Sequence, residues 1–284
     1  MKDYAVGAKH GGHYSAPLKH EDRVRAHDAL RASATFKEQE TRFNRLIRDF
    51  AQAFVMGRVA ATRNTFLCEN SLTLQRADDI AEAAVSIQAL VAEGMHNPAR
   101  REERYAIESL VKYLLIDQRY PTALLSERLG RFGGIERGTI GMVDDIVLFM
   151  LKDEVACEFR GEVKSEYARL CRYVHASSPL LRERLSDARR GAFPGLESVR
   201  QFESMNRELT RFFDLCLTLL FHAIGSPETG DAFIQVFDDD AGWKFHRTKF
   251  MRHVSAHFDY KTERARRPQP GSQPRGDSRR EARG

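Results

Sequence analysis

Apolar side chains recur at steps of three and four residues along most of the chain, which is the spacing of one face of an α-helix. The clearest run lies within residues 36–66, at Phe43, Leu46, Ile47, Phe50, Phe54, Val55 and Val59. Similar patterns predict helices over residues 22–33, 77–93, 97–118, 143–154, 162–174, 197–223, 231–237 and 243–257, and one that ends near residue 190. No segment alternates convincingly with the period of two that marks a half-buried strand. The pattern therefore predicts an all-α protein, an irregular helical bundle with one main domain.

Local signals mark several helix boundaries. Gly94 favours a helix end, because glycine readily adopts the backbone conformation that closes a helix. Asn97 followed by Pro98 suits a helix start, as a capping residue and a residue with a fixed φ angle. Five glycines between residues 130 and 141 mark the best candidate for an internal hinge. The helix over 197–223 becomes apolar on all sides toward its end, which predicts the central helix of the core.

The net charge of +5 is unevenly distributed. Residues 264–284 contain seven arginines against two acidic residues, so this segment accounts for the whole excess and the remainder is balanced. Because the segment is rich in Pro, Gly, Ser and Gln, we predict a disordered tail over 263–284, a flexible arm over 1–20 and a helical domain over 21–262. Arg266 and Arg267 are candidates for weak contacts with nucleic-acid phosphates. The alternative is an unstructured end that aids solubility.

Composition excludes several classes of protein. With 42% hydrophobic residues among 284, the chain has enough apolar material for a core. The longest apolar run, residues 215–224, is too short to span a bilayer, and the first residues lack an apolar signal segment. The four cysteines are widely spaced, which argues against a zinc finger and favours reduced thiols. We expect a cytoplasmic protein without membrane association, metal or cofactor, with Cys171 and Cys216 as small core residues.

The strongest candidate for a catalytic site is the pair Arg169 and His175. Five residues lie between them, and a helix break is predicted directly afterwards, at 176–179. An imidazole that titrates near neutral pH can accept or donate the proton of a ribose hydroxyl. A guanidinium can neutralise the charge that builds on a phosphate during cleavage. The alternative is that His175 only caps the C-terminus of a helix, where a cationic side chain is favoured.

This pair resembles the R-x(4–6)-H motif of HEPN domains, a family of small helical bundles found among RNA-targeting toxins and host-defence effectors. The resemblance implies that Arg169 and His175 come from the end of one helix and the start of the next. It also implies that two protomers pair to form a composite cleft, which cleaves RNA without a metal ion. Leu170 departs from the pattern, since many HEPN motifs carry a polar residue directly after the arginine.

Glu162, Glu166, Arg169 and Tyr173 fall on one stripe of the helix predicted over 162–174. One interpretation makes this stripe the wall of a catalytic cleft, in which Glu166 orients Arg169. The other interpretation makes it an exposed row of ion pairs that contributes modestly to stability, as pairs one helical turn apart usually do.

A second charged cluster lies near the start of the helix predicted over 97–118. Arg100, Arg101 and Arg104 are candidates for gripping phosphates at this position. The alternative is an ordinary solvated face, which is the usual role of such a mixed run of charges.

Three histidines near the end of the chain raise the question of a metal site. His222 lies within an apolar helix and is predicted to be a hydrogen-bonded core residue rather than a ligand. His253 and His257 have a spacing that can chelate a metal, but no HExxH pattern accompanies them. The sequence therefore favours the absence of a metal centre.

Two function hypotheses follow from these patterns. The first is a HEPN-like, metal-independent endoribonuclease that acts on RNA as a homodimer, with Arg169, His175, Glu166 and Tyr173 at its active site. The second is a non-catalytic helical protein that binds a protein or nucleic-acid partner through its surfaces and its tail. The placement of His175 relative to Arg169 distinguishes the two.

Overall fold

The structure is a computed structural model that describes residues 20–174, 177–189 and 195–265. Helices take up 78% of these described residues and none of them is in a strand, which confirms the predicted all-α class. The α-helices are α1 (His20–Arg31), α2 (Ala34–Ala61), α3 (Thr65–Asn70), α4 (Leu72–Gln75), α5 (Ala77–Ala92), α6 (His96–Arg119), α7 (Leu125–Phe132), α8 (Asp153–Cys171), α9 (Ser178–Arg189), α10 (Val199–Ile224), α11 (Ser226–Gln235), α12 (Met251–Ala256) and α13 (Thr262–Ala265). Short 3₁₀ segments are η1 (Ile140–Asp145), η2 (Phe237–Asp239) and η3 (Lys244–Arg247).

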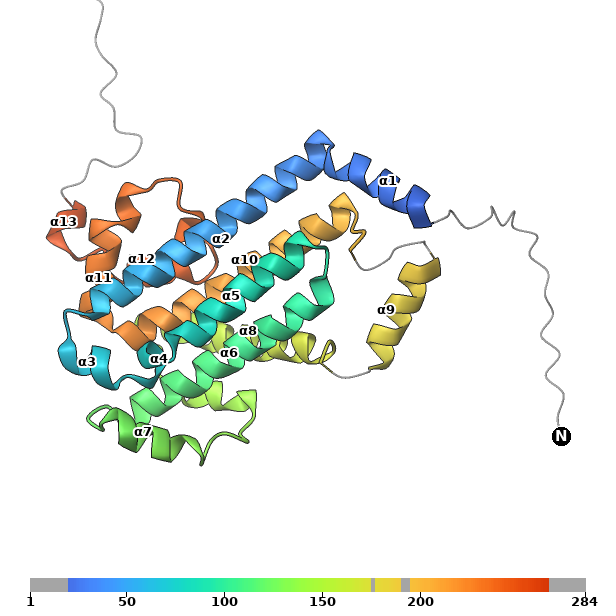
Figure 1. Cartoon of the computed structure of the whole chain (residues 1–284). Coiled ribbons are helices and arrows are strands. Elements are labelled where there is room, and N and C mark those ends of the chain that lie inside the picture. Colours follow the sequence, from blue (N-terminus) through green and yellow to red (C-terminus); the bar gives the residue numbers. More distant parts are fainter. Residues whose placement is uncertain (1–19, 175–176, 190–194, 266–284) are drawn as a thin grey trace, which may run out of the picture.

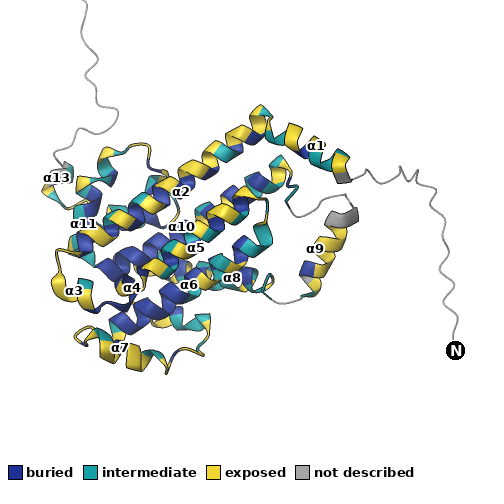
Figure 2. Ribbon diagram, viewed as in Figure 1, coloured by how far each residue is buried: buried dark blue, intermediate teal, exposed yellow. Residues whose placement is uncertain are grey.

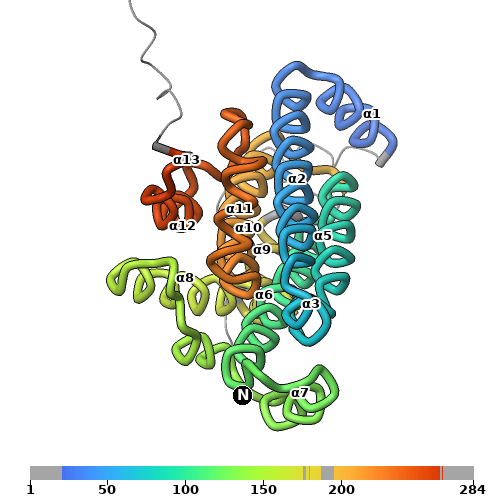
Figure 3. Tube along the Cα trace, turned by 90° about the vertical axis from the view of Figure 1, so that its left-hand side faces the viewer, coloured from blue at the N-terminus to red at the C-terminus, as the bar shows by residue number. Residues whose placement is uncertain are grey.

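Helix α10 occupies the centre of the bundle, with α2 and α6 packed against it (Figures 1 and 3). Helices α5 and α8 pack on α6, and α11 packs on α2. Every residue from Phe212 to Ile224 is buried, so the helix is enclosed on all sides there (Figure 2). This enclosure confirms the central role predicted for the segment 197–223 from its all-round apolar character.

Two glycines serve the packing of this bundle. A side chain at Gly57 of α2 would place its Cβ 2.6 Å from the Ile224 side chain, so glycine allows α2 and α10 to approach closely. Gly94 has a φ of +68° and lies two positions after Ala92, the last residue of α5, as predicted for a helix end.

The expected helix over 143–154 is wrong. Residues 140–145 form the 3₁₀ segment η1, and residues 146–152 are irregular until α8 begins at Asp153. Asp153 and Glu154 stand in the first turn of α8, where carboxylates complement the helix dipole, so they mark a start rather than an end. The side-chain amide of Gln118 pairs with both the N–H and the C=O of Val147, at 2.8 and 2.9 Å, so these backbone groups bond to a side chain rather than within a helix.

Two other expected helices are interrupted. The one over 36–66 ends at Ala61, and a new helix begins after Asn64, whose side chain accepts a hydrogen bond from the backbone N–H of Leu67. The one over 243–257 splits into η3 and α12. The Asp214 carboxylate accepts from the backbone N–H groups of Phe250 and Met251, which fixes a separate start for α12.

The folded part of the chain extends past the boundary expected at residue 263. Arg264 donates to both carboxylate oxygens of Asp238, at 2.6 and 2.7 Å, and its guanidinium lies 5.4 Å from the ring centre of Phe233. The rest of the predicted tail, 266–284, and the arm up to residue 19 lie outside the described residues.

Candidate functional site

The Arg169 guanidinium is surrounded by three carboxylates from three helices. Its Nε and Nη2 donate to the two oxygens of Glu166, one turn earlier on α8, at 3.0 and 2.6 Å. Its Nη1 donates to Glu208 on α10 at 2.8 Å, and its Nη2 also reaches Glu103 on α6 at 3.4 Å. The Arg169 side chain is 22% exposed, while that of Glu103 is completely buried. Glu166 therefore orients Arg169, as one interpretation of the α8 stripe predicted, but the group is buried rather than an exposed row.

The arginines predicted as a separate basic face on α6 reach the same region. Arg100 forms a two-pronged pair with Glu208, at 3.0 and 3.1 Å, and its guanidinium lies 4.6 Å from the Tyr173 ring centre. Arg101 donates from Nε to the backbone carbonyl of Tyr173 at 2.8 Å. The structure thus joins two clusters that lie about 70 residues apart in the sequence. We call Arg100, Glu103, Glu166, Arg169 and Glu208 the charge cluster.

Other predicted members lie at the margins of the charge cluster. Arg104 donates to the Tyr167 hydroxyl at 2.7 Å and pairs with Glu108 at 3.2 Å. Glu162, at the far end of the predicted stripe, turns away and pairs with Lys249 at 2.7 Å. His175, Arg266 and Arg267 lie outside the described residues.

Burial and charge act in opposite directions on the glutamates of the charge cluster. Burial raises the pKa of Glu103 to about 8, although Arg169 opposes the shift. Burial also acts to raise the pKa of Glu208, but Arg100 and Arg169 outweigh it, so that pKa lies below its ordinary value. Glu103 is consequently the member of the charge cluster that is protonated near neutral pH, whereas Glu208 carries a full charge.

The arrangement satisfies the arginines internally. Arg169 directs four hydrogen bonds to carboxylates, and a guanidinium has five N–H donors in all. A substrate phosphate at this position would have to displace a bound carboxylate. Three buried atoms on α6 have no hydrogen-bond partner among the described residues: Glu103 Oε1, His96 Nε2 and Arg104 Nε. Burial, with a contribution from Arg100, lowers the pKa of His96 to about 4, so this imidazole is neutral at physiological pH.

Glu208 was missed by the sequence reasoning, and only a weak signal marks it. It is an acidic residue beside the buried Leu209 on a helix whose residues are all buried from Phe212 onward. Its partners Arg100 and Arg169 lie 108 and 39 residues away, a separation that no local pattern encodes.

The remaining candidates have structural roles. The buried His222 accepts a hydrogen bond at Nε2 from the backbone N–H of Met150, 3.2 Å away, and its Nδ1 lies 2.7 Å from the carbonyl of Thr218, which confirms the predicted core histidine. Cys216 is buried and Cys171 is half-buried, and all four cysteines are free. Among the described residues, no three His, Cys, Asp or Glu side chains are grouped so as to hold a metal ion.

Comparisons with known proteins found no counterpart: no family model, no curated protein and no solved structure matches the chain. Within the described residues, no single helix has the length and apolar character to cross a membrane. Helix α10 and residues 226–239 meet that criterion only as a pair, bent by 120°.

Proposed function

We propose that this chain is a non-catalytic helical interaction protein whose partner is another protein. The observation that carries the proposal is the enclosure of Arg169 by Glu103, Glu166 and Glu208. A ribonuclease of the predicted kind needs this guanidinium free to clamp a phosphate. An arginine already held by three glutamate side chains, of which Glu103 is protonated near neutral pH, is better suited to fixing three helices together.

The balance of charge favours a protein partner over a nucleic acid. Binding to a phosphate backbone draws on lysines and arginines that are not already neutralised. On α6, Arg100 pairs with Glu208 and Arg104 pairs with Glu108, so two of the three arginines of the basic run are neutralised, while Arg101 donates to a backbone carbonyl. The described domain also lacks the net positive charge that resides in the last 21 residues of the sequence.

Apolar exposure on α9 points in the same direction. Leu181 and Leu185 lie one turn apart on this helix and are 54% and 60% exposed. Helix α9 stands at the edge of the bundle, and most of its described surface is open (Figures 1 and 2). Paired apolar residues on one helical face are the anchors by which a helix docks into a groove on a protein partner.

The second candidate, a HEPN-like ribonuclease, has one observation in its favour. Arg100, Arg101, Arg169 and Tyr173 gather at the C-terminal end of α8. His175 follows two positions after Tyr173 in the sequence. A composite cleft across a homodimer would add a second set of these groups, so the candidate remains testable.

Incubation with total RNA separates the two functions. We expect no cleavage by the wild-type protein, with or without EDTA, across a range of RNA substrates. The variants His175→Ala and Arg169→Lys serve as the matched comparison, because each keeps the helical content measurable by circular dichroism. Wild-type cleavage that EDTA leaves intact and that His175→Ala abolishes would replace the interaction proposal with the ribonuclease.

Site-specific photo-cross-linking tests the protein partner directly. A cross-linking amino acid at position 185 should give a discrete adduct in cells, identifiable by mass spectrometry, and Leu181→Asp should abolish it. The same group at Glu38, an exposed position on α2, is the control. Equal cross-linking at both positions would contradict a docking role for α9.

A further inference from the structure

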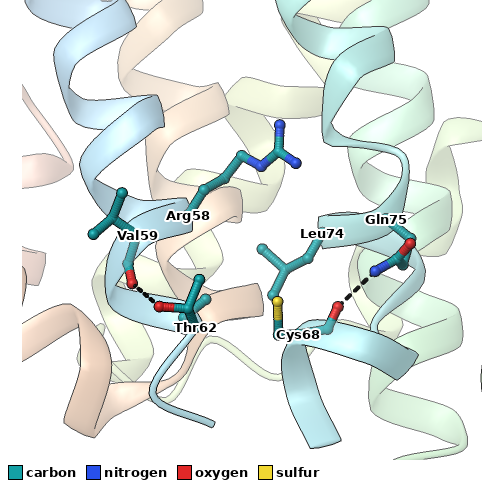
Figure 4. Close-up of a pocket in the computed structure, with 7 residues that line it drawn as sticks. Arg58, Val59, Thr62, Cys68, Leu74 and Gln75 are labelled. Atoms are coloured by element: carbon teal, nitrogen blue, oxygen red, sulfur yellow. Dashed lines mark hydrogen bonds between the residues drawn. The ribbon is translucent and has the colours of Figure 1, made fainter. Parts of the chain in front are cut away.

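A small pocket, lined by no residue of the charge cluster, lies where the end of α2 meets α3 and α4 (Figure 4). Its lining residues are Arg58, Val59, Ala61, Thr62, Cys68, Leu74 and Gln75, and its volume is about 160 Å³. Figure 4 shows the Leu74 side chain and the Cys68 sulfur side by side at the base, with Arg58 reaching across the opening.

The polar groups of the pocket differ in what they can offer a ligand. The Thr62 hydroxyl donates to the carbonyl of Val59 at 2.7 Å, and the Gln75 amide donates to the carbonyl of Cys68 at 2.7 Å. These bonds lie within the wall itself. Arg58 has one partner among the described residues, Asp78, which receives its Nη1 at 2.7 Å. The Nε and Nη2 of this guanidinium, which lines the pocket, have no acceptor among the described residues.

The size of the space limits what fits. A cavity of about 150 Å³ with apolar walls is large enough for a benzene molecule. Here Val59, Ala61 and Leu74 supply the apolar part of the lining, and the pocket is open to solvent on one side. An apolar body of about six carbon atoms matches the pocket in volume. A guanidinium at the rim selects a planar, two-oxygen anion.

We propose that this pocket binds a small monocarboxylic acid, with its apolar body between Val59, Ala61 and Leu74 and its carboxylate on Arg58. Asp78 is 73% exposed on its side chain, so it can turn into solvent and release Arg58 to the ligand. An exposed pair of this kind contributes little stability, so the exchange has a small cost. The proposal is independent of the protein-partner function, because it uses no residue of α9 or of the charge cluster.

Cys68 provides a reporter within the pocket. Benzoate is the probe and benzamide, which has the same shape without the charge, is the control. Alkylation of Cys68 by iodoacetamide is followed by mass spectrometry on the full chain. Cys157 is exposed and lies outside the pocket, so its labelling supplies an internal reference in the same sample. We expect about 50 mM benzoate, roughly ten times a Kd of about 5 mM, to slow labelling of Cys68 at least threefold relative to Cys157, and benzamide to have no such effect.

Two variants should shift the binding in opposite directions. Arg58→Gln removes the anion-binding group and should raise the Kd for benzoate at least about tenfold, so that protection of Cys68 is largely lost. Asp78→Asn removes the competing carboxylate and should tighten binding about two- to fivefold, which corresponds to the strength of an exposed ion pair. Arg63→Gln is the matched control, because Arg63 lies five positions further along, pairs with Asp231 and does not line the pocket.

Each outcome decides the proposal. Protection by benzoate alone, lost in Arg58→Gln and retained in Arg63→Gln, supports it, provided that thermal melting shows all variants folded. Equal protection by benzamide would overturn the role of the carboxylate and leave a merely apolar cavity. Absence of protection at 50 mM benzoate, a concentration of about ten times a weak millimolar Kd, would overturn the site altogether.

Discussion

The two halves of α10 bury polar side chains in different ways. In the first half, Glu208 meets the guanidinium groups of Arg100 and Arg169 in a cluster of opposite charges. In the second half, Asp214 and His222 meet backbone groups instead. Asp214 accepts hydrogen bonds from the hydroxyl of Thr248 and from two backbone N–H groups at 2.7–2.9 Å. His222 accepts one from the backbone N–H of Met150.

This difference separates polar groups that shape loops from charges that join helices. Asp214 and His222 fix the irregular segments 244–251 and 146–150, whose N–H groups would otherwise be buried without acceptors. The charge cluster ties α6, α8 and α10 together, but it has to recover the cost of removing several charges from water. The hydrogen bonds of Asp214 and His222 should therefore contribute more to the free energy of unfolding. The charge cluster should contribute more to the pH dependence of that free energy.

The largest effect should follow from Asp214→Ala. The change leaves the buried N–H groups of Phe250 and Met251 without their acceptor, whereas the Thr248 hydroxyl can still donate to the carbonyl of Phe245, 2.9 Å away. Each unsatisfied buried donor costs about 1–3 kcal/mol, so we expect a loss of about 4 kcal/mol in the free energy of unfolding, measured with urea. Asp214→Asn keeps one acceptor oxygen and should lose roughly half as much. A loss below 1 kcal/mol for the alanine variant would show that the loop finds other partners.

The two halves also differ in what the sequence could predict. The central position of α10 and the hydrogen-bonded role of His222 follow from local pattern, because a polar residue on an apolar face needs a partner nearby. The pairing of Arg169 with Glu166 follows from their spacing on one helix. Two features could not be predicted: Glu208 as the shared partner of Arg100 and Arg169, and the hydrogen bonds from Asp214 that fix the start of α12. Both depend on contacts between residues 36 or more positions apart.

A substitution in the charge cluster should lower the free energy of unfolding by less, and Arg169→Met tests this. The change keeps much of the aliphatic bulk but leaves Glu166 and Glu208 near each other with Arg100 as the remaining cation. Loss of one member of a buried ion pair typically costs about 3–5 kcal/mol, and the partial exposure of Arg169 places the expected loss at about 2 kcal/mol. Arg119→Met, which breaks an exposed pair with Asp145, is the control and should cost less than about 0.5 kcal/mol. Increased stability of Arg169→Met would mean that the charge cluster is retained for a reason other than folding.

The smallest effect concerns the pH dependence of the same cluster and is tested with Glu103→Gln. Below pH 4.5 the Glu103 carboxyl holds its proton in both the folded and the unfolded chain. Between 4.5 and about 8 only the folded chain holds it, because burial raises its pKa there, so stability falls as the pH rises through this window. Glutamine cannot titrate and has nearly the same shape as the protonated acid.

We therefore expect the wild type to lose about 1 kcal/mol relative to Glu103→Gln between pH 7 and pH 8.5, measured by urea unfolding of both proteins at each pH. His96 and His222, whose pKa values burial lowers to about 4, add a slope of the opposite sign between pH 4 and 6.5. That slope is common to both proteins and cancels in their difference. If the difference is instead independent of pH, the Glu103 carboxyl is ionised in the folded chain despite its burial. The charge cluster then holds three negative charges. Arg169 would then be held more tightly still, and the ribonuclease candidate would be weakened further.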